Sequence, residues 1–286
     1  MENISHINFI LNGFSEFGTL RPLLFIPFFI MFGLSLSANS LLLYAVISQR
    51  SLHSPMYILI SSMACVDISL PLFFIPNMLL NFLFDWRGIS LLGCLVQMHF
   101  LHFVGTFQST VLVWMAATLP FVLLCTITNS CQNVLMITLI VSLTGTLSFC
   151  ASNVINHCFC EHMALVELAC GNTAINNLVG LLTVCLTVVV DFILSLPLIS
   201  SFKAFHTCIT HIVVMSFTLI LALTVFLSYR IRNHLPASSR VLFSTMYLLF
   251  PSCLNPIIYG IRTKEIRQQI LKTLTGCCQT AVVLRT

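Results

Sequence analysis

Residues 88–160 read GISLLGCLVQMHFLHFVGTFQSTVLVWMAATLPFVLLCTITNSCQNVLMITLIVSLTGTLSFCASNVINHCFC and contain no Asp, Glu, Lys or Arg. A surface in water could hardly stay uncharged over so long a stretch, and a soluble core does not require one. About 20 apolar residues suffice to cross a hydrocarbon layer about 30 Å thick. The stretch therefore predicts helices that cross a membrane.

The composition of the whole chain agrees with this prediction. Of its 286 residues, 58% are hydrophobic and 7% are charged, whereas about 25% are charged in typical soluble domains. The net charge of +4 is small and no basic cluster is present, which argues against nucleic acid as a partner. A soluble enzyme is excluded, and we find no nucleophile–base–acid set and no phosphate-binding glycine loop. The partner that the composition implies is membrane lipid.

Seven apolar spans can be placed along the chain. We expect one all-α domain over residues 1–286, with 1–21 outside the cell, seven helices in 22–261 and a cytoplasmic tail at 262–286. The turn between spans three and four is expected at TITNSCQN, Thr126–Asn133. The first span lacks a basic lead and is too long for a cleaved signal peptide, so we interpret it as a signal anchor. The spans are Pro22–Ile47, Pro55–Phe82, Leu92–Cys125, Asn133–Cys150, Asn176–Ile199, Ala204–Ser228 and Val241–Ile261.

An odd number of spans places the two termini on opposite sides of the membrane. With the N-terminus outside, seven Lys and Arg residues fall on the cytoplasmic side and five outside, which is the bias that cytoplasmic loops carry. Asn3 begins the glycosylation sequon Asn3-Ile4-Ser5, which needs the same arrangement. We therefore expect a multi-pass plasma-membrane protein with an extracellular N-terminus.

Four cysteines occur from Cys150 to Cys170, together with two histidines and two glutamates. The gaps between these cysteines match no common zinc site. The segment connects spans four and five, which places it outside the cell, where disulfides persist. We therefore expect disulfides rather than a metal site, and Cys94, which opens span three, is a further extracellular cysteine that can pair with this loop.

The chain contains five motifs in order: LHSPMYILISSMACVDIS (Leu52–Ser69), CLVQMHFLHFVGTFQSTVLVWMA (Cys94–Ala116), HCFCEHMALVELACGNT (His157–Thr173), KAFHTCITHI (Lys203–Ile212) and PSCLNPIIYGIRTKEIR (Pro251–Arg267). They resemble odorant receptors, which are rhodopsin-like G-protein-coupled receptors with seven transmembrane helices. HCFCEHM resembles the class I, fish-like branch, which is associated with carboxylic acids and other hydrophilic odorants. The resemblance implies a receptor in the cilia of olfactory sensory neurons, not an enzyme, that detects small volatile organic ligands and signals to a stimulatory G protein.

The resemblance also implies how the cysteines pair. Cys94 would bond to Cys160, which ties helix three to the second extracellular loop, and Cys150 would bond to Cys170. Cys158 would remain an extra thiol. Such bonds contribute about 2–4 kcal/mol each, mainly by restricting the unfolded chain.

Asp67 lies in the middle of span two, where a carboxylate costs about 2.5–3.5 kcal/mol to insert. The resemblance implies a sodium-linked switch, with Na⁺ as its only cofactor; the alternative is a protonated acid that only holds helices together. Gln108 stands where many of these receptors have a Glu, so an ion would meet less negative charge. Pro256 removes a backbone donor, which loosens the helix so that Tyr259 can swing. The switch comprises Asp67, Asn39, Gln108, Asn255, Pro256 and Tyr259.

The expected ligand residues are His102, two turns below Cys94, and Arg230, at the outer end of span six. The resemblance implies that Arg230 holds a carboxylate, which arginine binds through two hydrogen bonds; the alternative is a boundary residue that snorkels. The rest of the mostly apolar pocket would be lined by Met98, Phe103, Thr106 and Phe226, each of which is otherwise an ordinary packing residue.

Two other classes of membrane protein are disfavoured. Asp191, in span five, is a second buried acid, but neither it nor Asp67 lies in the glycine-flanked motif of an intramembrane aspartyl protease. A transporter would show paired repeats, and none is visible.

The segment after span seven predicts a helix on the inner leaflet. Thr263–Leu274 places Ile266, Ile270, Leu271 and Leu274 on one side and its basic residues elsewhere, as amphipathic interfacial helices do. Cys277 and Cys278 follow and are predicted sites of palmitoylation.

Three features of the expected cytoplasmic face depart from the family. Thr118, Leu119 and Pro120 stand where the family has Asp-Arg-Tyr, and a proline inside that helix would cost about 3 kcal/mol or bend it. The second intracellular loop is reduced to Thr126–Asn133, and span five, Asn176–Ile199, is too short to extend into the cytoplasm. The alternative function is therefore a variant or decayed odorant receptor that binds ligand but couples poorly to its G protein.

Overall fold

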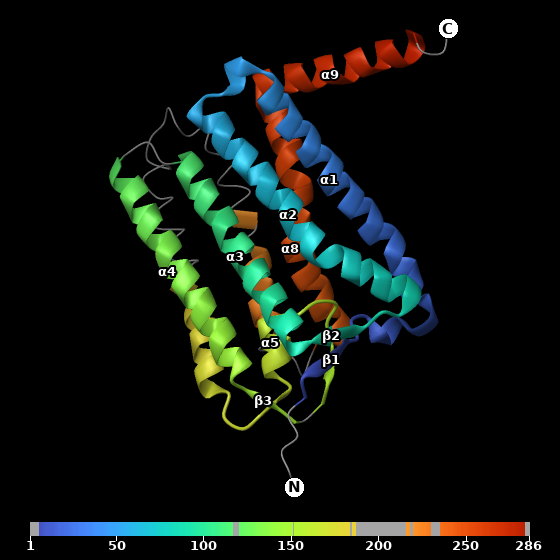
Figure 1. Cartoon of the computed structure of the whole chain (residues 1–286), viewed down its shortest axis with the longest axis vertical. Coiled ribbons are helices and arrows are strands. Elements are labelled where there is room, and N and C mark those ends of the chain that lie inside the picture. Colours follow the sequence, from blue (N-terminus) through green and yellow to red (C-terminus); the bar gives the residue numbers. More distant parts are fainter. Residues whose placement is uncertain are drawn as a thin grey trace.

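The computed structural model describes residues 6–116, 120–150, 152–183, 185–186, 216–217, 220–229 and 235–283. Its long helices run side by side as a bundle, and one further helix projects sideways from one end of the bundle (Figure 1). The bundle helices with continuous bounds are α1 (Phe25–Ser48), α2 (Pro55–Phe84), α3 (Leu91–Ala116), α4 (Pro120–Gly145) and α8 (Ala237–Arg262), and the projecting helix is α9 (Lys264–Val283).

Three helical segments among the described residues are long and apolar enough to cross a membrane, namely Ser15–Ser48, Pro55–Phe84 and Ala237–Arg262. Shorter apolar helices occupy Ala174–Thr183 and Ile220–Tyr229, in the expected spans five and six. The remaining residues of those two spans, Asp191 among them, lie outside the described part of the chain. The described helices are consistent with the seven-helix bundle that the sequence predicts.

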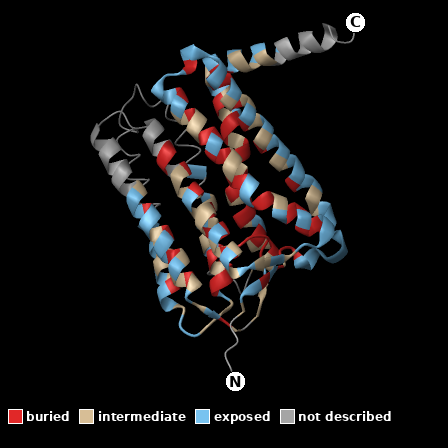
Figure 2. Cartoon of the chain, viewed as in Figure 1, coloured by how far each residue is buried: buried red, intermediate tan, exposed pale blue. Residues whose placement is uncertain are grey.

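The helix faces that point away from the bundle are apolar. Phe29 and Ile30 of α1 and Ile58 of α2 are exposed, and exposed residues follow the outer sides of these helices (Figure 2). Lipid tails are as apolar as these side chains, so such a face carries no penalty in a membrane. Between the helices, Phe74 and Leu249 are fully buried in the core that α2 and α8 share with α1 and α3.

The boundary between the third and fourth helices differs from the prediction. α3 ends at Ala116 and α4 begins at Pro120, so the predicted turn at Thr126–Asn133 lies inside α4. Pro120 is not interior to the third helix: it is the first residue of the fourth, where a missing N–H is no loss. The polar side chains of TITNSCQN are all uncharged, and a helix tolerates such side chains. Thr118 and Leu119 lie outside the described residues.

Five short strands among the described residues, which the sequence did not predict, cover one end of the bundle. β1 (Asn8–Leu11) pairs antiparallel with β2 (Gly88–Ser90) and parallel with β4 (Val154–Ile155). β3 (Ser148–Phe149) pairs antiparallel with β5 (Ala169–Cys170), and a short helix, α5 (His162–Val166), lies between β4 and β5 in the chain. The expected N-terminal tail is therefore part of an ordered cap, at the opposite end of the bundle from α9 (Figure 1).

A 3₁₀ helix at Ser15–Leu24 ties this cap to two bundle helices. Arg21 is buried, and its guanidinium donates to the carbonyl oxygen of Gly13 at 3.0 Å, to Asn81 and to Asp85 at 3.2 Å, the last two at the end of α2. The carboxylate of Glu16 accepts a hydrogen bond from the main-chain N–H of Ala237 at 3.1 Å, at the start of α8. The segment before α1 thus bridges the ends of α2 and α8 that lie at the cap.

The predicted amphipathic helix is present and longer than expected. α9 runs to Val283, and its Ile266 is fully buried beside Ile270, in a cluster that also holds side chains of α1, α2 and α8. Leu271, expected on the same side, is exposed. Cys277 and Cys278 fall within α9, but their side chains lie outside the described part.

The contact between Gly13 and the loop yields a prediction. A Cβ at Gly13 would come within 2.7 Å of the main-chain N of Cys158 and 2.9 Å of the carbonyl carbon of His157. We expect Gly13→Ala to lower the free energy of unfolding by about 1–3 kcal/mol, because the backbone must shift. Thermal unfolding of the purified protein measures this.

Gly88→Ala is the matched control, because a Cβ there meets nothing within 4 Å. Adding Cys158→Ala should not rescue the Gly13 variant, since two of the three close contacts are to main-chain atoms. Equal melting temperatures for the two glycine variants would contradict the close packing of the N-terminal segment on the loop.

Candidate functional site

The cap is held to α3 by the disulfide that the resemblance implied. Cys94 and Cys160 are bonded with their Cα atoms 5.2 Å apart, and Cys150 and Cys170 with theirs 5.8 Å apart. Cys158 is a free, buried thiol, as expected. The loop between α4 and the Ala174–Thr183 helix is therefore closed on itself and fastened to the first turn of α3.

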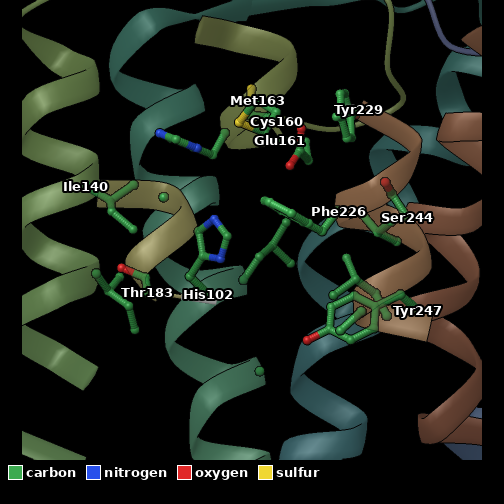
Figure 3. A pocket seen from close by; sticks show the side chains of 18 of the residues that line it. His102, Ile140, Cys160, Glu161, Met163, Thr183, Phe226, Tyr229, Ser244 and Tyr247 are labelled. Carbon is green, nitrogen blue, oxygen red and sulfur yellow. The ribbon is translucent and has the colours of Figure 1, made fainter. Parts of the chain in front are cut away.

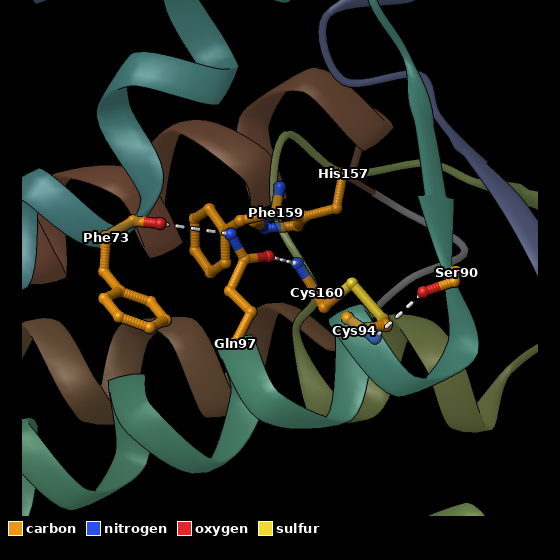
Figure 4. The surroundings of a disulfide bond; sticks show 8 residues. Phe73, Ser90, Cys94, Gln97, His157, Phe159 and Cys160 are labelled. Carbon is orange, nitrogen blue, oxygen red and sulfur yellow. Dashed lines mark hydrogen bonds between the residues drawn. A yellow bond between two sulfur atoms is a disulfide. The ribbon is translucent and has the colours of Figure 1, made fainter.

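Gln97 reinforces this attachment, and sequence reasoning missed it. Its side-chain oxygen accepts a hydrogen bond from the main-chain N–H of Cys160 at 2.8 Å, and its nitrogen donates to the carbonyl oxygen of Phe73 at 3.4 Å (Figure 4). One amide side chain therefore joins α2, α3 and the loop. The position of Gln97 one turn after Cys94 could have indicated from the sequence that it lies near the loop.

A cavity of about 190 Å³ lies beneath the fastened loop. Its walls come from α3, α4, the Ala174–Thr183 and Ile220–Tyr229 helices and α8, and residues 159–163 of the loop close it. Most of the lining is apolar, with a small number of polar groups, as is typical of sites for small organic molecules. In Figure 3, the side chains of His102, Phe226 and Tyr247 surround one space.

The structure brings together half of the predicted ligand residues. His102, Thr106 and Phe226 line the cavity. Met98 does not: it is buried in the cluster around Cys94 and Cys160, because the loop fills the space above His102. Phe103 points out of the bundle, where it is exposed and stacks on Phe107 at 6.2 Å. Arg230 lies outside the described residues.

Glu161 is a carboxyl group at the loop side of the cavity that sequence reasoning did not single out. It caps α5 by accepting a hydrogen bond from the N–H of Ala164 at 2.9 Å, and it is hydrogen-bonded to the hydroxyl of Tyr229. Burial raises the pKa of Glu161 above its ordinary value, although these hydrogen bonds oppose the shift. Arg240 lies over the ring of Tyr229 at 5.2 Å and forms an ion pair with Glu167 at 3.4 Å. This ion pair therefore lies next to Tyr229, which lines the cavity.

Two loop histidines are buried without charge. His157 accepts a hydrogen bond from the N–H of Phe159 at 3.3 Å and contacts that ring edge-on, and burial lowers its pKa to about 3. His162 lines the cavity, and burial, with the nearby His102, lowers its pKa to about 3. The Nε2 atoms of both are buried and find no hydrogen-bond partner within the described chain.

The predicted switch residues meet in the middle of the bundle. Asp67 is fully buried and accepts hydrogen bonds from Gln108 of α3 and Asn255 of α8, both at 3.0 Å. Asn39 of α1 donates at 2.8 Å to the carbonyl oxygen of Ser252, one turn from Asn255. The group therefore joins α1, α2, α3 and α8. Pro256 and Tyr259 follow Asn255 in α8, and both are buried.

The side chains around Asp67 fit a small cation in one respect. The amide oxygens of Asn39 and Asn255 are buried and have no hydrogen-bond partner among the described residues. Carboxylate and carbonyl oxygens are the ligands of hard cations. Gln108 donates an N–H to Asp67 and would have to turn its amide oxygen inward to add a ligand. No cluster of three His, Cys, Asp or Glu side chains suited to a metal occurs in the described part of the chain.

Together, the bundle of apolar helices, the disulfide-fastened loop over a small cavity and the polar group at mid-depth define a receptor of the seven-helix membrane class. The family model for olfactory receptors matches residues 28–276. The chain is 34% identical to human olfactory receptor 52K2 over 92% of its own length and 93% of that receptor. Human olfactory receptor 51F2 is 31% identical over 93% of this chain and 86% of its own.

The chain therefore belongs to the olfactory receptor family. Members of this family are G-protein-coupled odorant receptors and are not enzymes, so the receptor interpretation from sequence is confirmed, as is the multi-pass membrane protein that it implies.

The hydrogen bond from Gln108 to Asp67 yields a prediction. Gln108→Leu leaves one buried oxygen of Asp67 without its donor, so we expect the free energy of unfolding to fall by about 1–3 kcal/mol. Thermal unfolding in detergent measures the change. Ser69→Ala is the control, because that hydroxyl donates to the carbonyl oxygen of Cys65 in its own helix, in an exposed hydrogen bond. A Gln108 variant as stable as the control would refute the role of this hydrogen bond.

From the low pKa values of the two buried histidines we predict that the folded protein is less stable in acid. The pKa of His157 and of His162 is about 3 in the folded state and about 6.5 in the unfolded chain, so below pH 6.5 the unfolded state binds more protons. The free energy of unfolding should therefore fall as pH drops from about 6.5 toward 3, by up to about 1.4 kcal/mol per pH unit for each histidine. Melting temperatures at pH 7, 6 and 5 measure this slope.

The contribution of His157 can be isolated by substitution. His157→Gln removes one titrating group, so the decline in melting temperature between pH 7 and 5 should become shallower. His53→Gln, which changes an exposed histidine, should leave the slope as it is. An unchanged slope in the His157 variant would refute its part in the acid sensitivity.

Proposed function

We propose that this odorant receptor binds small volatile organic molecules in the cavity beneath the Cys94–Cys160 loop and passes the signal to a stimulatory heterotrimeric G protein. The observation that carries the proposal is the cavity itself, in which His102, Thr106 and Phe226 from two helices face a loop fixed by a disulfide. Ligand binding would shift an equilibrium between helix arrangements that already exists.

Carboxylic acids are proposed members of the ligand set, with Arg230 as their partner. The support is the resemblance to the class I branch and the place of Arg230 directly after Tyr229, which lines the cavity. Loss of responses to acids in Arg230→Ala, with other responses retained, is the result expected.

The proposed setting is the plasma membrane of olfactory cilia, with the N-terminus outside and residues 262–286 in the cytoplasm as part of one seven-helix domain. Glycosylation at Asn3 and palmitoylation at Cys277 and Cys278 belong to this proposal. Its support is the pair of disulfides in the cap, since disulfides persist in oxidising surroundings.

A sodium ion near Asp67 is proposed as the cofactor of the switch. Its support is the pair of buried amide oxygens, on Asn39 and Asn255, that lack partners among the described residues. If an ion binds there, it would neutralise Asp67 and hold α1, α2 and α8 together.

A receptor that binds ligand without coupling is the second candidate function. The alignment with olfactory receptor 52K2 spans 296 positions, more than the 286 residues of this chain, so parts of that receptor have no counterpart here. At most three residues, 117–119, connect α3 to α4. Thr118, Leu119 and Pro120, which replace the charged triplet of the family, lie at this connection.

The test is odorant-evoked cyclic AMP in cells whose surface staining confirms delivery of an N-terminally tagged receptor. Short acids and alcohols should evoke a response, and Phe226→Ala should raise the half-maximal concentration about tenfold or more by removing a cavity wall. Phe29→Ala, a lipid-facing change on α1, is the matched control.

The second candidate would be favoured if the receptor reaches the cell surface but odorants evoke no cyclic AMP. Grafting in the α3–α4 connection of olfactory receptor 52K2 should then restore the cyclic AMP response. Silence in both forms would contradict the proposed function.

A further inference from the structure

The segment before α1 turns apolar side chains away from the protein. Leu20 and Leu23 are each 59% exposed, and Phe17 is 43% exposed. Gly18, whose φ is 48°, interrupts the 3₁₀ helix of Ser15–Leu24, and both leucines follow this interruption. Side chains three residues apart in a 3₁₀ helix lie above one another, so the two leucines form one apolar face.

The charged side chains of the same segment are engaged within the protein. Arg21 is buried and donates to the carbonyl oxygen of Gly13 and to the carboxylate of Asp85. Glu16 accepts a hydrogen bond from the main-chain N–H of Ala237. The segment is therefore amphipathic, since one side binds the cap and the ends of α2 and α8 while the other side exposes leucines.

The exposed apolar face continues into α1. Ile26 and Phe29 follow Leu23 at intervals of three residues, and both are exposed. Ser15–Ser48 accordingly forms one apolar helical run of 34 residues. The lipid-facing side of α1 thus extends onto the preceding segment, which lies at the end of α1 away from α9 (Figure 1).

The length of α1 places the segment at the surface of a bilayer rather than inside it. α1 has 24 residues, which at 1.5 Å per residue span about 36 Å. A hydrocarbon layer is roughly 30 Å thick, so the 3₁₀ helix is not needed to cross it. A segment in this position meets the zone between headgroups and acyl chains, where amphipathic helices bind by their apolar faces.

Two aromatic side chains mark the same level on α2. Phe84, the last residue of α2, is 72% exposed, and Trp86 is 71% exposed. They flank Asp85, which binds Arg21 at 3.2 Å, so they lie next to the segment. Tryptophan is enriched where a membrane meets water, because its ring is apolar and its N–H is polar. The aromatic pair therefore indicates a membrane surface at this level of the bundle.

We propose that Ser15–Leu24 is an interfacial anchor, which lies in the surface of the bilayer at the cap end of the bundle with Leu20 and Leu23 among the lipids. This goes beyond the proposed function, in which the chain before α1 has no membrane role. Arg21 and Arg87, which lie beside the anchor, both pair with Asp85. The partner is therefore the apolar part of the phospholipid rather than an anionic headgroup, and anchoring is independent of lipid charge.

The test places a tryptophan on the exposed face and measures its contact with lipid. The full chain carries Leu20→Trp, together with Trp86→Phe and Trp114→Phe to remove its two native tryptophans, and is reconstituted in phosphatidylcholine vesicles. The acyl chains are brominated either near the headgroup or near the chain end, because bromine quenches tryptophan fluorescence on contact. We expect the Leu20 variant to lose most of its fluorescence with the bromine near the headgroup and less with the deep bromine.

Two control positions bracket the expected depth. Leu34→Trp, at an exposed position near the middle of α1, should be quenched most by the deep bromine. Asn8→Trp, at an exposed position of β1 in the cap, should be quenched by iodide added to the water and by neither lipid. Leu23→Trp repeats the measurement if the Leu20 variant does not fold, since the two side chains are equally exposed.

Every other result overturns the inference. Quenching of the Leu20 variant by iodide, without quenching by lipid, places the segment in water, and quenching chiefly by the deep bromine places it in the hydrocarbon layer. Protection from both quenchers places it under another part of the chain or under a second copy. Quenching by lipid only after phosphatidylserine is added reveals a contact driven by charge. None of these results concerns the odorant cavity, so the proposed function is tested separately.

Discussion

A covalent bond between the first turn of α3 and the loop from β3 to β5 sets the geometry of the half of this receptor that carries the cap. Cys94 and Cys160 place the loop over the cavity, and Gln97 orients the strand of loop that follows His157. The disulfide adds a covalent constraint to the pairing of β4 with β1 and to the hydrogen bond between Cys160 and Gln97. Held in this way, residues 159–163 form a wall of the cavity.

The middle of the bundle depends on a different constraint, the absence of water. In hydrocarbon the backbone must satisfy itself, so helices are required, and buried polar side chains must find one another. Asp67, Gln108 and Asn255 do so across three helices. The same constraint explains why apolar side chains are found both inside the bundle and on its surface.

The sequence predicted the helices well and their ends less well. Long apolar runs identify spans, but the end of α3 was missed because TITNSCQN was the only polar stretch and Pro120 was assigned to the wrong helix. The strands were not predicted, because strands of two to four residues show no periodicity and their pairing depends on the tertiary position of the loop. Cysteine pairing and the Asp67 group followed from the family motifs.

The cavity was predicted only in part for a physical reason. His102 and Thr106 lie on one face of α3, which spacing along a helix reveals. Met98 shares that face, but whether it meets ligand or loop depends on where the disulfide holds the loop. Glu161 and Tyr229 come from distant segments, and no pattern in a single sequence relates them.

The contact between Glu16 and Ala237 has a consequence for biosynthesis. The two residues are 221 positions apart, and the acceptor is among the first parts of the chain to be made, whereas the donor opens the last membrane helix. A chain is synthesised and inserted from its N-terminus. The contact between the cap and α8 therefore cannot form until α8 has been made, and a nascent receptor that stalls before α8 presents an incomplete cap to the quality-control machinery of the cell.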